Sequence, residues 1–213
     1  MDRTTRFFIA RHGETVFNAA ARMQGDHVHT PLTRAGFAQA DEMGGALKAY
    51  LDRHPGPLPT LWASDTGRAL QTLAVVAEHI GADWHQTRVD PRLREIDLAE
   101  WGGRNYADVI AEGGPLFDPA SGLLTRTAPG GEWYDHIAAR LSAWLADTRD
   151  EPGDRLVIMH GLSSCVLRGV MTGIAHDPIL KAGVAAGLPQ GSMVMVADGT
   201  ETVIHRGRGW APA

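Results

Sequence analysis

Short apolar runs alternate along the chain with longer segments in which apolar residues recur three or four positions apart. The short runs end in polar or turn-forming residues, which is typical of buried strands, and they are residues 6–10, 60–63, 155–159, 193–197 and 202–206. The longer segments have the spacing of helices with one buried face, and they are residues 33–54, 67–80, 131–148 and 162–171. A helical turn at 15–21 and a short helix at 105–112 complete the predicted elements.

Capping and turn residues support these boundaries. Thr33 can cap the first long helix, and the proline-rich segment 55–59 stops it. Asp65 or Thr66 can cap the next helix, and the Asp-Gly pair at 198–199 is typical of a hairpin turn. Because strands alternate with helices, the sequence predicts an α/β protein. We expect a three-layer α/β/α sandwich with a mostly parallel central sheet and an antiparallel edge strand.

Length and composition narrow the class of protein. The chain has 213 residues, enough for one well-buried core, so we expect a single domain over residues 1–213. A net charge of -5 gives no reason to expect a nucleic acid or an anionic membrane as partner. The single cysteine, Cys165, allows no intrachain disulfide, and we expect a core thiol in a reducing compartment. With no apolar leader or membrane span in the sequence, we expect a soluble cytoplasmic protein.

One segment departs from the alternation of strands and helices. Residues 104–131 contain several prolines and glycines and, after the short helix, have no periodic pattern. Long irregular segments inside a compact domain are often active-site lids. We therefore expect these residues to form a flap that covers a substrate.

Candidate chemistry gathers where three of the predicted strands end. Arg11 and His12 follow the first strand, Arg68 lies just past the second, and His160 follows the strand at 155–159. In a doubly wound sheet such strand ends lie on one edge, so we expect these side chains to converge on one crevice. Two guanidinium groups and two helix N-termini there would form a phosphate pocket.

The arginine beside His12 restricts what this histidine can do. A histidine at a strand end can be a base, a metal ligand or a nucleophile. Arg11 repels a metal cation and suits an oxyanion or phosphate. An imidazole with an ordinary pKa of ~6.5 is largely neutral at pH 7, and nearby guanidinium groups disfavour its protonation further.

Segments in a fixed order along the chain suggest a family. Arg11-His12-Gly13-Glu14-Thr15 resembles the signature of the histidine phosphatase superfamily, the phosphoglycerate mutase-like enzymes. Further agreement, in order along nearly the whole chain, is found at Gln24-Gly25, Pro31-Leu32-Thr33, Ser64, Arg68-Ala69, Gln71-Thr72, Leu93-Arg94-Glu95-Ile96, Glu100-Trp101, Gly131-Glu132 and His160-Gly161. A lone Arg-His-Gly would be weak evidence, whereas this ordered set is specific.

The resemblance implies a phosphoglycerate mutase-like fold and a phosphoryl-transfer site. In the family the histidine of the first motif is phosphorylated, and here that residue is His12. Arg11, Arg68 and His160 match the residues around the phosphoryl group, and Glu95 matches the general acid and base.

Further phosphate or substrate contacts are implied for Asn18, Gln24, Gly25 and Gly161. The resemblance implies no metal and no organic cofactor in this branch. The expected partners are a small phosphorylated metabolite and inorganic phosphate, and the expected state is a monomer or a homodimer.

Three functions follow from the family pattern. Family members pass the phosphoryl group either to water or to a second hydroxyl, and the mutases resemble one another in a longer, basic insertion after the acid. Between Arg104 and Gly131 this chain has one further basic residue, Arg126, which favours a phosphomonoester hydrolase over a cofactor-dependent phosphoglycerate mutase. A non-catalytic phospho-ligand-binding protein is the alternative of another class, and the intact Arg, His and Glu set argues against it.

Two departures from the family pattern leave the leaving-group pocket and the natural substrate open. Trp133 stands where the family often has serine, and the approach to Arg68 through residues 65–67 is unusual. Arg22, Arg94 and Arg126 are equally candidates for substrate contacts and for ordinary exposed arginines.

Overall fold

The computed structural model describes residues 5–209. The first four residues lie outside it, and the prediction for the amino terminus partly rests on them. The last four residues of the predicted domain also lie outside it. A six-stranded sheet with the order β3-β2-β4-β1-β5-β6 forms the centre. Its strands are β1 (Phe7–Arg11), β2 (Thr60–Ala63), β3 (Arg88–Val89), β4 (Arg155–Met159), β5 (Met193–Ala197) and β6 (Thr200–His205).

The sheet is parallel from β3 to β1 and antiparallel at its other side. β1 and β2 both pair with β4 in parallel, while β5 pairs antiparallel with β1 and with β6. The register sets Arg11 opposite Met159 and Ala63 opposite Ile158. The carboxyl ends of β1, β2 and β4 therefore lie together at one edge of the sheet.

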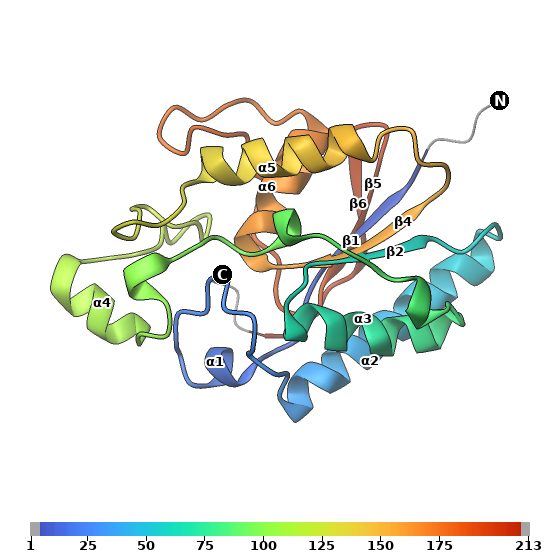
Figure 1. The fold of residues 1–213 in the computed structure, drawn as a ribbon, viewed down its shortest axis with the longest axis horizontal. Helices are drawn as coiled ribbons and strands as arrows, with labels where there is room; N and C mark the ends of the chain where they lie inside the picture. The colour runs from blue at the N-terminus through green and yellow to red at the C-terminus, as the bar shows by residue number, and fades with distance from the viewer. Residues whose placement is uncertain (1–4, 210–213) are drawn as a thin grey trace.

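Helices cover both faces of the sheet (Figure 1). On one face lie α2 (Arg34–Arg53) and α3 (Gly67–Ile80), and on the other lie α5 (Tyr134–Asp147) and α6 (Gly161–Thr172). Two shorter helices, α1 (Val16–Ala19) and α4 (Tyr106–Gly113), lie at the end of the sheet where the loops gather. The predicted three-layer α/β/α sandwich is confirmed.

Alternating side chains of the strands build two hydrophobic cores. In β1, Phe7 and Ile9 belong to the core beneath α5 and α6, and Phe8 and Ala10 belong to the core beneath α2 and α3. Successive strand residues point to opposite faces. Because helices cover both faces, β1 and β4 are apolar except for one arginine at an end of each strand.

Local signals explain where the elements begin and end. The Thr33 side chain accepts a hydrogen bond from the Gly36 N–H and caps α2, as predicted. The α3 cap differs, because Thr66 makes no side-chain cap bond and Asp65 pairs with Arg94 instead. At the hairpin between β5 and β6 Asp198 has a positive φ of 48°, a conformation that Asp tolerates in such turns.

The structure adds elements that the apolar pattern does not indicate. The segment at 84–93, which lies outside every predicted element, contains the edge strand β3 between one-turn 3₁₀ helices at Trp84–Gln86 and Pro91–Leu93. β3 is two residues long and exposed, so it has no apolar run to find. Within the expected flap, Phe117 and Leu124 pair across a small hairpin.

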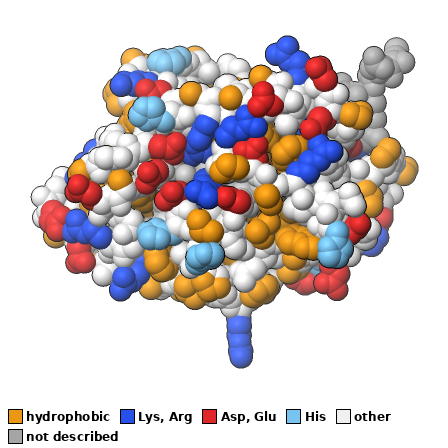
Figure 2. Space-filling view, in the orientation of Figure 1, with side chains coloured by type: hydrophobic (Ala, Val, Ile, Leu, Met, Phe, Trp, Pro, Cys, Tyr) orange, Lys and Arg blue, Asp and Glu red, His pale blue; other side chains and the backbone are white. Residues whose placement is uncertain are grey.

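Charges of both signs are interspersed on the face seen in Figure 2, without a large region of one sign. The net charge of -5 is thus not concentrated on this face. Among residues 5–209, no helix has the length and apolarity that crossing a membrane requires.

Candidate active site

Two histidines face each other where β1 and β4 end. The His12 N–H continues the ladder by donating to the Met159 carbonyl at 3.0 Å, and His160 is the N-cap residue of α6. The two imidazole centroids are 5.1 Å apart at an interplanar angle of 66°, and both side chains are buried. Residues 148 positions apart in the chain therefore meet, as the strand-end argument predicts.

The loop after His12 is fixed by a close approach of α2. A Cβ built on Gly13 would lie 2.2 Å from the Gly36 carbonyl oxygen, so only glycine fits there. The Gly13 N–H donates to Thr72 Oγ1 at 3.2 Å, and Thr33 donates from its N–H and its hydroxyl to Glu14. These bonds leave His12 little freedom to move.

The hydrogen bonds of His12 define which nitrogen is reactive. Nδ1 lies 2.7 Å from the carbonyl oxygen of Gly13, which can only accept, so the proton is on Nδ1. Nε2 then carries the free lone pair of a neutral imidazole. Burial lowers the pKa of His12 well below 6.5, and the Arg68 and Arg11 guanidinium groups lower it further. The side chain is thus an uncharged imidazole at neutral pH.

Arg68, in the first turn of α3, uses most of its guanidinium within the protein. Its Nη1 donates to the carbonyl of His27 and to Thr30 Oγ1, and its Nη2 donates to the carbonyl of Gly25 at 2.7 Å. Nε donates to Nδ1 of His160 at 3.1 Å. Within residues 5–209 one Nη2 hydrogen is left without a partner, and burial lowers the pKa of Arg68 to about 10. It remains a cation at pH 7 and holds the loop at 25–30 against the site.

His160 is held in the opposite tautomer to His12. Its Nδ1 accepts from Arg68, so its proton is on Nε2. Nε2 is buried and has no partner among the described residues. Burial lowers the pKa of His160 well below 6.5, and Arg68 adds to the effect. His160 therefore offers one neutral N–H donor next to His12.

Two side-chain amides have their orientation fixed by Thr15. The Thr15 N–H donates to Asn18 Oδ1 at 3.1 Å, and the Thr15 hydroxyl lies 2.5 Å from Gln24 Oε1. Because both amide oxygens are occupied, the NH₂ groups of Asn18 and Gln24 can face the pocket that both residues line.

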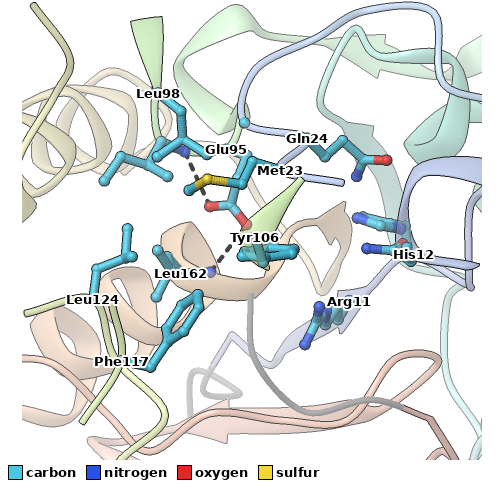
Figure 3. A pocket seen from close by; sticks show the side chains of 13 residues that line it. Arg11, His12, Met23, Gln24, Glu95, Leu98, Tyr106, Phe117, Leu124 and Leu162 are labelled. Atoms are coloured by element: carbon cyan, nitrogen blue, oxygen red, sulfur yellow. Dashed lines mark hydrogen bonds between the residues drawn. The ribbon is translucent and has the colours of Figure 1, made fainter. Parts of the chain in front are cut away.

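The Glu95 carboxylate is bound by the N-terminus of α6. It accepts from the N–H of Leu162 at 3.1 Å, of Ser163 at 2.9 Å and of Ile96 at 3.0 Å. Backbone N–H groups at a helix start favour a negative charge. Glu95 is 7% exposed and lines the same pocket as His12 (Figure 3).

A partly buried ion pair holds the loop that carries Glu95. Arg140 of α5 donates to the carbonyls of Arg92 and Glu95 and to both oxygens of Glu132. Glu132 Oε2 also accepts from the Asp97 N–H at 3.0 Å. This gives the Gly131-Glu132 segment a structural role. Arg140 was not predicted, and the only signal for it is a basic residue two helical turns after Glu132.

One pocket joins these residues to an apolar wall. Its polar side consists of Arg11, His12, Asn18, Gln24, Gly25 and Glu95, and its apolar side consists of Met23, Ile96, Leu98, Tyr106, Phe117, Leu124 and Leu162. In Figure 3, Arg11, His12 and Gln24 lie opposite Leu98, Leu124 and Phe117. Sequence reasoning found the polar side and did not identify the apolar one, because apolar residues in loops carry no chemical signature.

Of the remaining predicted site residues, Arg11 lines the pocket and Gly161 does not. Arg11 donates from Nη1 to the Leu188 carbonyl at 2.8 Å. Burial lowers the pKa of Arg11, and the nearby Glu95 offsets part of this effect. Gly161 starts α6 and accepts through its carbonyl from Ser164 and Cys165. Gly161 therefore supports the helix that binds Glu95.

Several residues left open by the sequence are engaged elsewhere. Arg94 pairs with Asp65, and Arg126 donates to the carbonyls of Val109 and Gly114, 4.8 Å from the Trp101 ring.

Trp133, which the sequence left open, and Cys165 are both structural. Trp133 donates from its indole N–H to the Ile179 carbonyl at 3.1 Å. Cys165 is a core thiol, as expected, and burial raises its pKa to about 11.

Comparison with known proteins agrees with this geometry. Residues 7–195 match the model of the histidine phosphatase superfamily (branch 1). A protein of Enterobacter sp. (strain 638) named probable phosphoglycerate mutase GpmB is 32% identical over 170 residues, 78% of this chain and 74% of that protein.

Solved structures share the whole fold. A mycobacterial glucosyl-3-phosphoglycerate phosphatase, solved as a complex with VO3, has a TM-score of 0.74 at 25% identity and covers 97% of this chain and 100% of its own. A putative alpha-ribazole-5'-P phosphatase from Escherichia coli str. K-12 substr. MG1655 shares the fold, with a TM-score of 0.72 at 20% identity over 97% of both chains. The predicted family is confirmed: this chain belongs to the histidine phosphatase superfamily, branch 1.

Proposed function

We propose that the protein is a metal-independent phosphomonoester hydrolase that forms a phosphohistidine intermediate on His12. The observation that carries the proposal is the pair of buried, neutral imidazoles with centroids 5.1 Å apart, in which His12 Nε2 carries a lone pair and His160 Nε2 carries a proton. One nitrogen can attack phosphorus while the other donates to a phosphoryl oxygen. We expect a small phosphorylated metabolite as substrate and inorganic phosphate as product.

In the first step His12 Nε2 bonds to phosphorus and the bond from phosphorus to the ester oxygen breaks. Glu95 passes a proton from the monoanionic phosphate ester to the departing oxygen, so that an alcohol leaves. Water then attacks the phosphohistidine and gives a proton to Glu95, and the nitrogen–phosphorus bond breaks to release phosphate.

The positive charge for this chemistry comes from side chains. The transferring phosphoryl group spreads negative charge over its equatorial oxygens, and fixed cations stabilise it. Arg11 supplies a guanidinium in the pocket, and Arg68 supplies a charge and one N–H. The NH₂ groups of Asn18 and Gln24 add oriented donors.

We further propose that residues 104–131 are the flap of a single domain that spans the chain. The apolar wall of the pocket supports this, because Tyr106, Phe117 and Leu124 come from these residues. The flap separates the reacting phosphorus from bulk water and contacts the leaving group.

Phosphoglycerate mutase activity is the second candidate, favoured by the name of the relative from Enterobacter. A mutase must hold the second anionic group of its substrate. Among the described residues lining the pocket, Arg11 is the only permanent cation, which favours hydrolysis. Incubation with 3-phosphoglycerate and 2,3-bisphosphoglycerate distinguishes the two, since a mutase forms 2-phosphoglycerate and a hydrolase releases phosphate.

The decisive experiment replaces the nucleophile. We expect His12→Ala to lower turnover of p-nitrophenyl phosphate by at least about 10³-fold, because no other group can accept the phosphoryl group. Wild-type protein quenched in alkali during turnover of phosphorus-labelled substrate should carry acid-labile, base-stable label, and the variant should carry none. His176→Ala, at an exposed position, is the control. Turnover retained in His12→Ala would refute the covalent mechanism, and tight phosphate binding without any wild-type turnover would favour the binding protein.

The acid role of Glu95 is tested by Glu95→Gln. We expect a loss of about 10²- to 10⁴-fold with an alkyl phosphate, whose leaving alkoxide needs a proton. With p-nitrophenyl phosphate the loss should be smaller, because nitrophenolate leaves without one. Steady-state rates on both substrates measure the difference, and equal losses would argue against general acid catalysis.

A further inference from the structure

The apolar side of the pocket lies where a leaving group must lie. His12 is on the polar side, Glu95 lies between the two sides, and Leu98, Phe117 and Leu124 lie opposite (Figure 3). A phosphate ester that is attacked by His12 and protonated on its leaving oxygen through Glu95 directs the leaving group toward these side chains.

This side is lined by aliphatic side chains and by two aromatic rings, one of which, Tyr106, carries a hydroxyl. Leu98, Leu124 and Met23 are 5%, 2% and 0% exposed, so they form a packed surface and not a solvated rim. The Tyr106 and Phe117 rings lie 5.7 Å apart at 50°. Burial raises the pKa of Tyr106, so its phenol is uncharged at neutral pH.

The pocket has no charge to pair with an anionic leaving group. Arg11 is the only permanent cation among the described residues that line it, and the phosphoryl group occupies that charge. Arg94 is bound to Asp65, and Arg126 to backbone carbonyls. A carboxylate or second phosphate in the apolar half would be desolvated without a partner, which is costly.

The pocket is also narrow, which limits the size and shape of the leaving group. The space open to the centre of a water-sized sphere is about 20 Å³, close to what a single water needs. The Phe117 wall belongs to the hairpin whose strands meet at Phe117 and Leu124. A compact or flat apolar group enters with a small displacement of that hairpin, whereas a hydrated polyol or nucleoside requires a large one.

We propose that the substrates are phosphate monoesters of uncharged, apolar alcohols, aryl or short alkyl, and that the wall formed by Leu98, Phe117 and Leu124 selects them. This inference rests on the proposed hydrolase function. It assigns selectivity to the wall and leaves the phosphoryl chemistry with His12.

Four substrates test the proposal on the wild-type enzyme. Phenyl phosphate and 3-carboxyphenyl phosphate differ by one remote carboxylate that changes the leaving oxygen little, and glycerol 1-phosphate is a compact polyol ester. We expect kcat/KM for phenyl phosphate to exceed that for 3-carboxyphenyl phosphate by about 10- to 100-fold. We also expect kcat/KM for n-butyl phosphate to exceed that for glycerol 1-phosphate. Both esters have alkyl leaving groups, so this comparison tests the effect of the hydroxyl groups.

A charge placed in the wall should reverse the preference. Phe117 is partly buried, and Phe117→Arg supplies the missing cation, so the ratio of phenyl to carboxyphenyl turnover should fall by about tenfold or more. Ile179→Arg adds the same charge at a position that is 73% exposed and outside the pocket, and it should leave the ratio unchanged. Phe117→Leu keeps the wall apolar, so it should keep the wild-type ratio of phenyl to carboxyphenyl turnover. This variant provides a second measurement if Phe117→Arg does not fold.

The outcomes separate this inference from the function on which it rests. If kcat/KM for 3-carboxyphenyl phosphate and glycerol 1-phosphate equals or exceeds that for their apolar counterparts, the inference is overturned. The proposed hydrolase function is not affected by that result. An unchanged ratio in a folded Phe117→Arg variant also overturns it. Absence of turnover on every ester in the wild type overturns the hydrolase function itself.

Discussion

The two halves of the pocket are built in different ways. On the polar half, His12 and His160 follow adjacent strands, and each is held by hydrogen bonds to groups far away in the chain or to the backbone. The apolar half comes mostly from loops and from the hairpin at 116–125, with Tyr106 of α4 and Leu162 of α6, and packing holds most of it. The sheet thus fixes the phosphoryl chemistry, while the loops can vary the leaving group without disturbing it.

The difference predicts unequal tolerance to substitution. A shift of one ångström in the polar half separates the nucleophile from phosphorus, whereas a similar shift in the hairpin changes the fit of the leaving group. Variants in the two halves should therefore alter different kinetic constants.

The largest effect is expected for Gly13→Ala. Its Cβ would lie 2.2 Å from the backbone oxygen of Gly36, so the loop next to His12 must move. We expect turnover to fall about 10²-fold or more, measured by steady-state kinetics. The free energy of unfolding should fall by about 1–3 kcal/mol, measured by urea denaturation.

Gly45→Ala is the matched control for that change. Gly45 lies in α2 with nothing within 4 Å of a built Cβ, so alanine should stabilise the helix by about 0.5–1 kcal/mol and leave turnover unaltered. If Gly13→Ala kept wild-type turnover, the polar half would be more adaptable than its contacts indicate.

A smaller effect is expected where the hairpin is tied to α5. The Tyr134 hydroxyl accepts from the Leu124 N–H at 2.7 Å, and Tyr134→Phe leaves that buried N–H without a partner. We expect KM to rise about 3- to 10-fold with kcat nearly unchanged, because the loss is in a wall and not in the reacting groups. Steady-state kinetics on phenyl phosphate measures both constants.

Tyr50→Phe is the control for the hairpin variant. The Tyr50 hydroxyl donates to the Met195 sulfur at 3.2 Å, on the opposite face of the sheet from Tyr134, so KM should not change. A fall in kcat without a change in KM for Tyr134→Phe would mean that the hairpin takes part in the phosphoryl step.

The same contrast explains what the sequence could predict. Arg11, His12 and His160 were found because a polar residue directly after an apolar strand has a known position in a parallel sheet. The apolar wall at Leu98, Phe117 and Leu124 depends on how loops pack, and no spacing encodes that.

For Arg68 the sequence predicted the position but not the bonding. It was expected mainly to contact phosphate, yet it also donates to the carbonyls of Gly25 and His27 and to His160. These partners lie on a loop without a periodic pattern. The division of its N–H groups follows from the folded loop and could not be derived from the residue type.

The smallest effect concerns the two buried histidines, which belong to the polar half alone. Burial lowers the pKa of both His12 and His160 in the folded protein, while in the unfolded chain they titrate near 6.5. Below that pH the unfolded chain takes up protons that the folded protein does not, so stability is complete above pH 6.5 and falls as the pH decreases. The slope is about 1.4 kcal/mol per pH unit for each histidine.

Removing one imidazole should therefore reduce the pH dependence of stability. The free energy of unfolding is measured by urea denaturation between pH 5 and 7.5. On the acid side it should fall less steeply with decreasing pH in His160→Gln than in the wild type, by on the order of 1.4 kcal/mol per pH unit. His205, whose pKa is also lowered by burial, keeps its share of the slope, and the exposed His176→Gln should change nothing. If the pH dependence of stability were the same in His160→Gln and in the wild type, His160 would take up a proton in the folded protein. Its imidazole would then not be the neutral N–H donor that we infer.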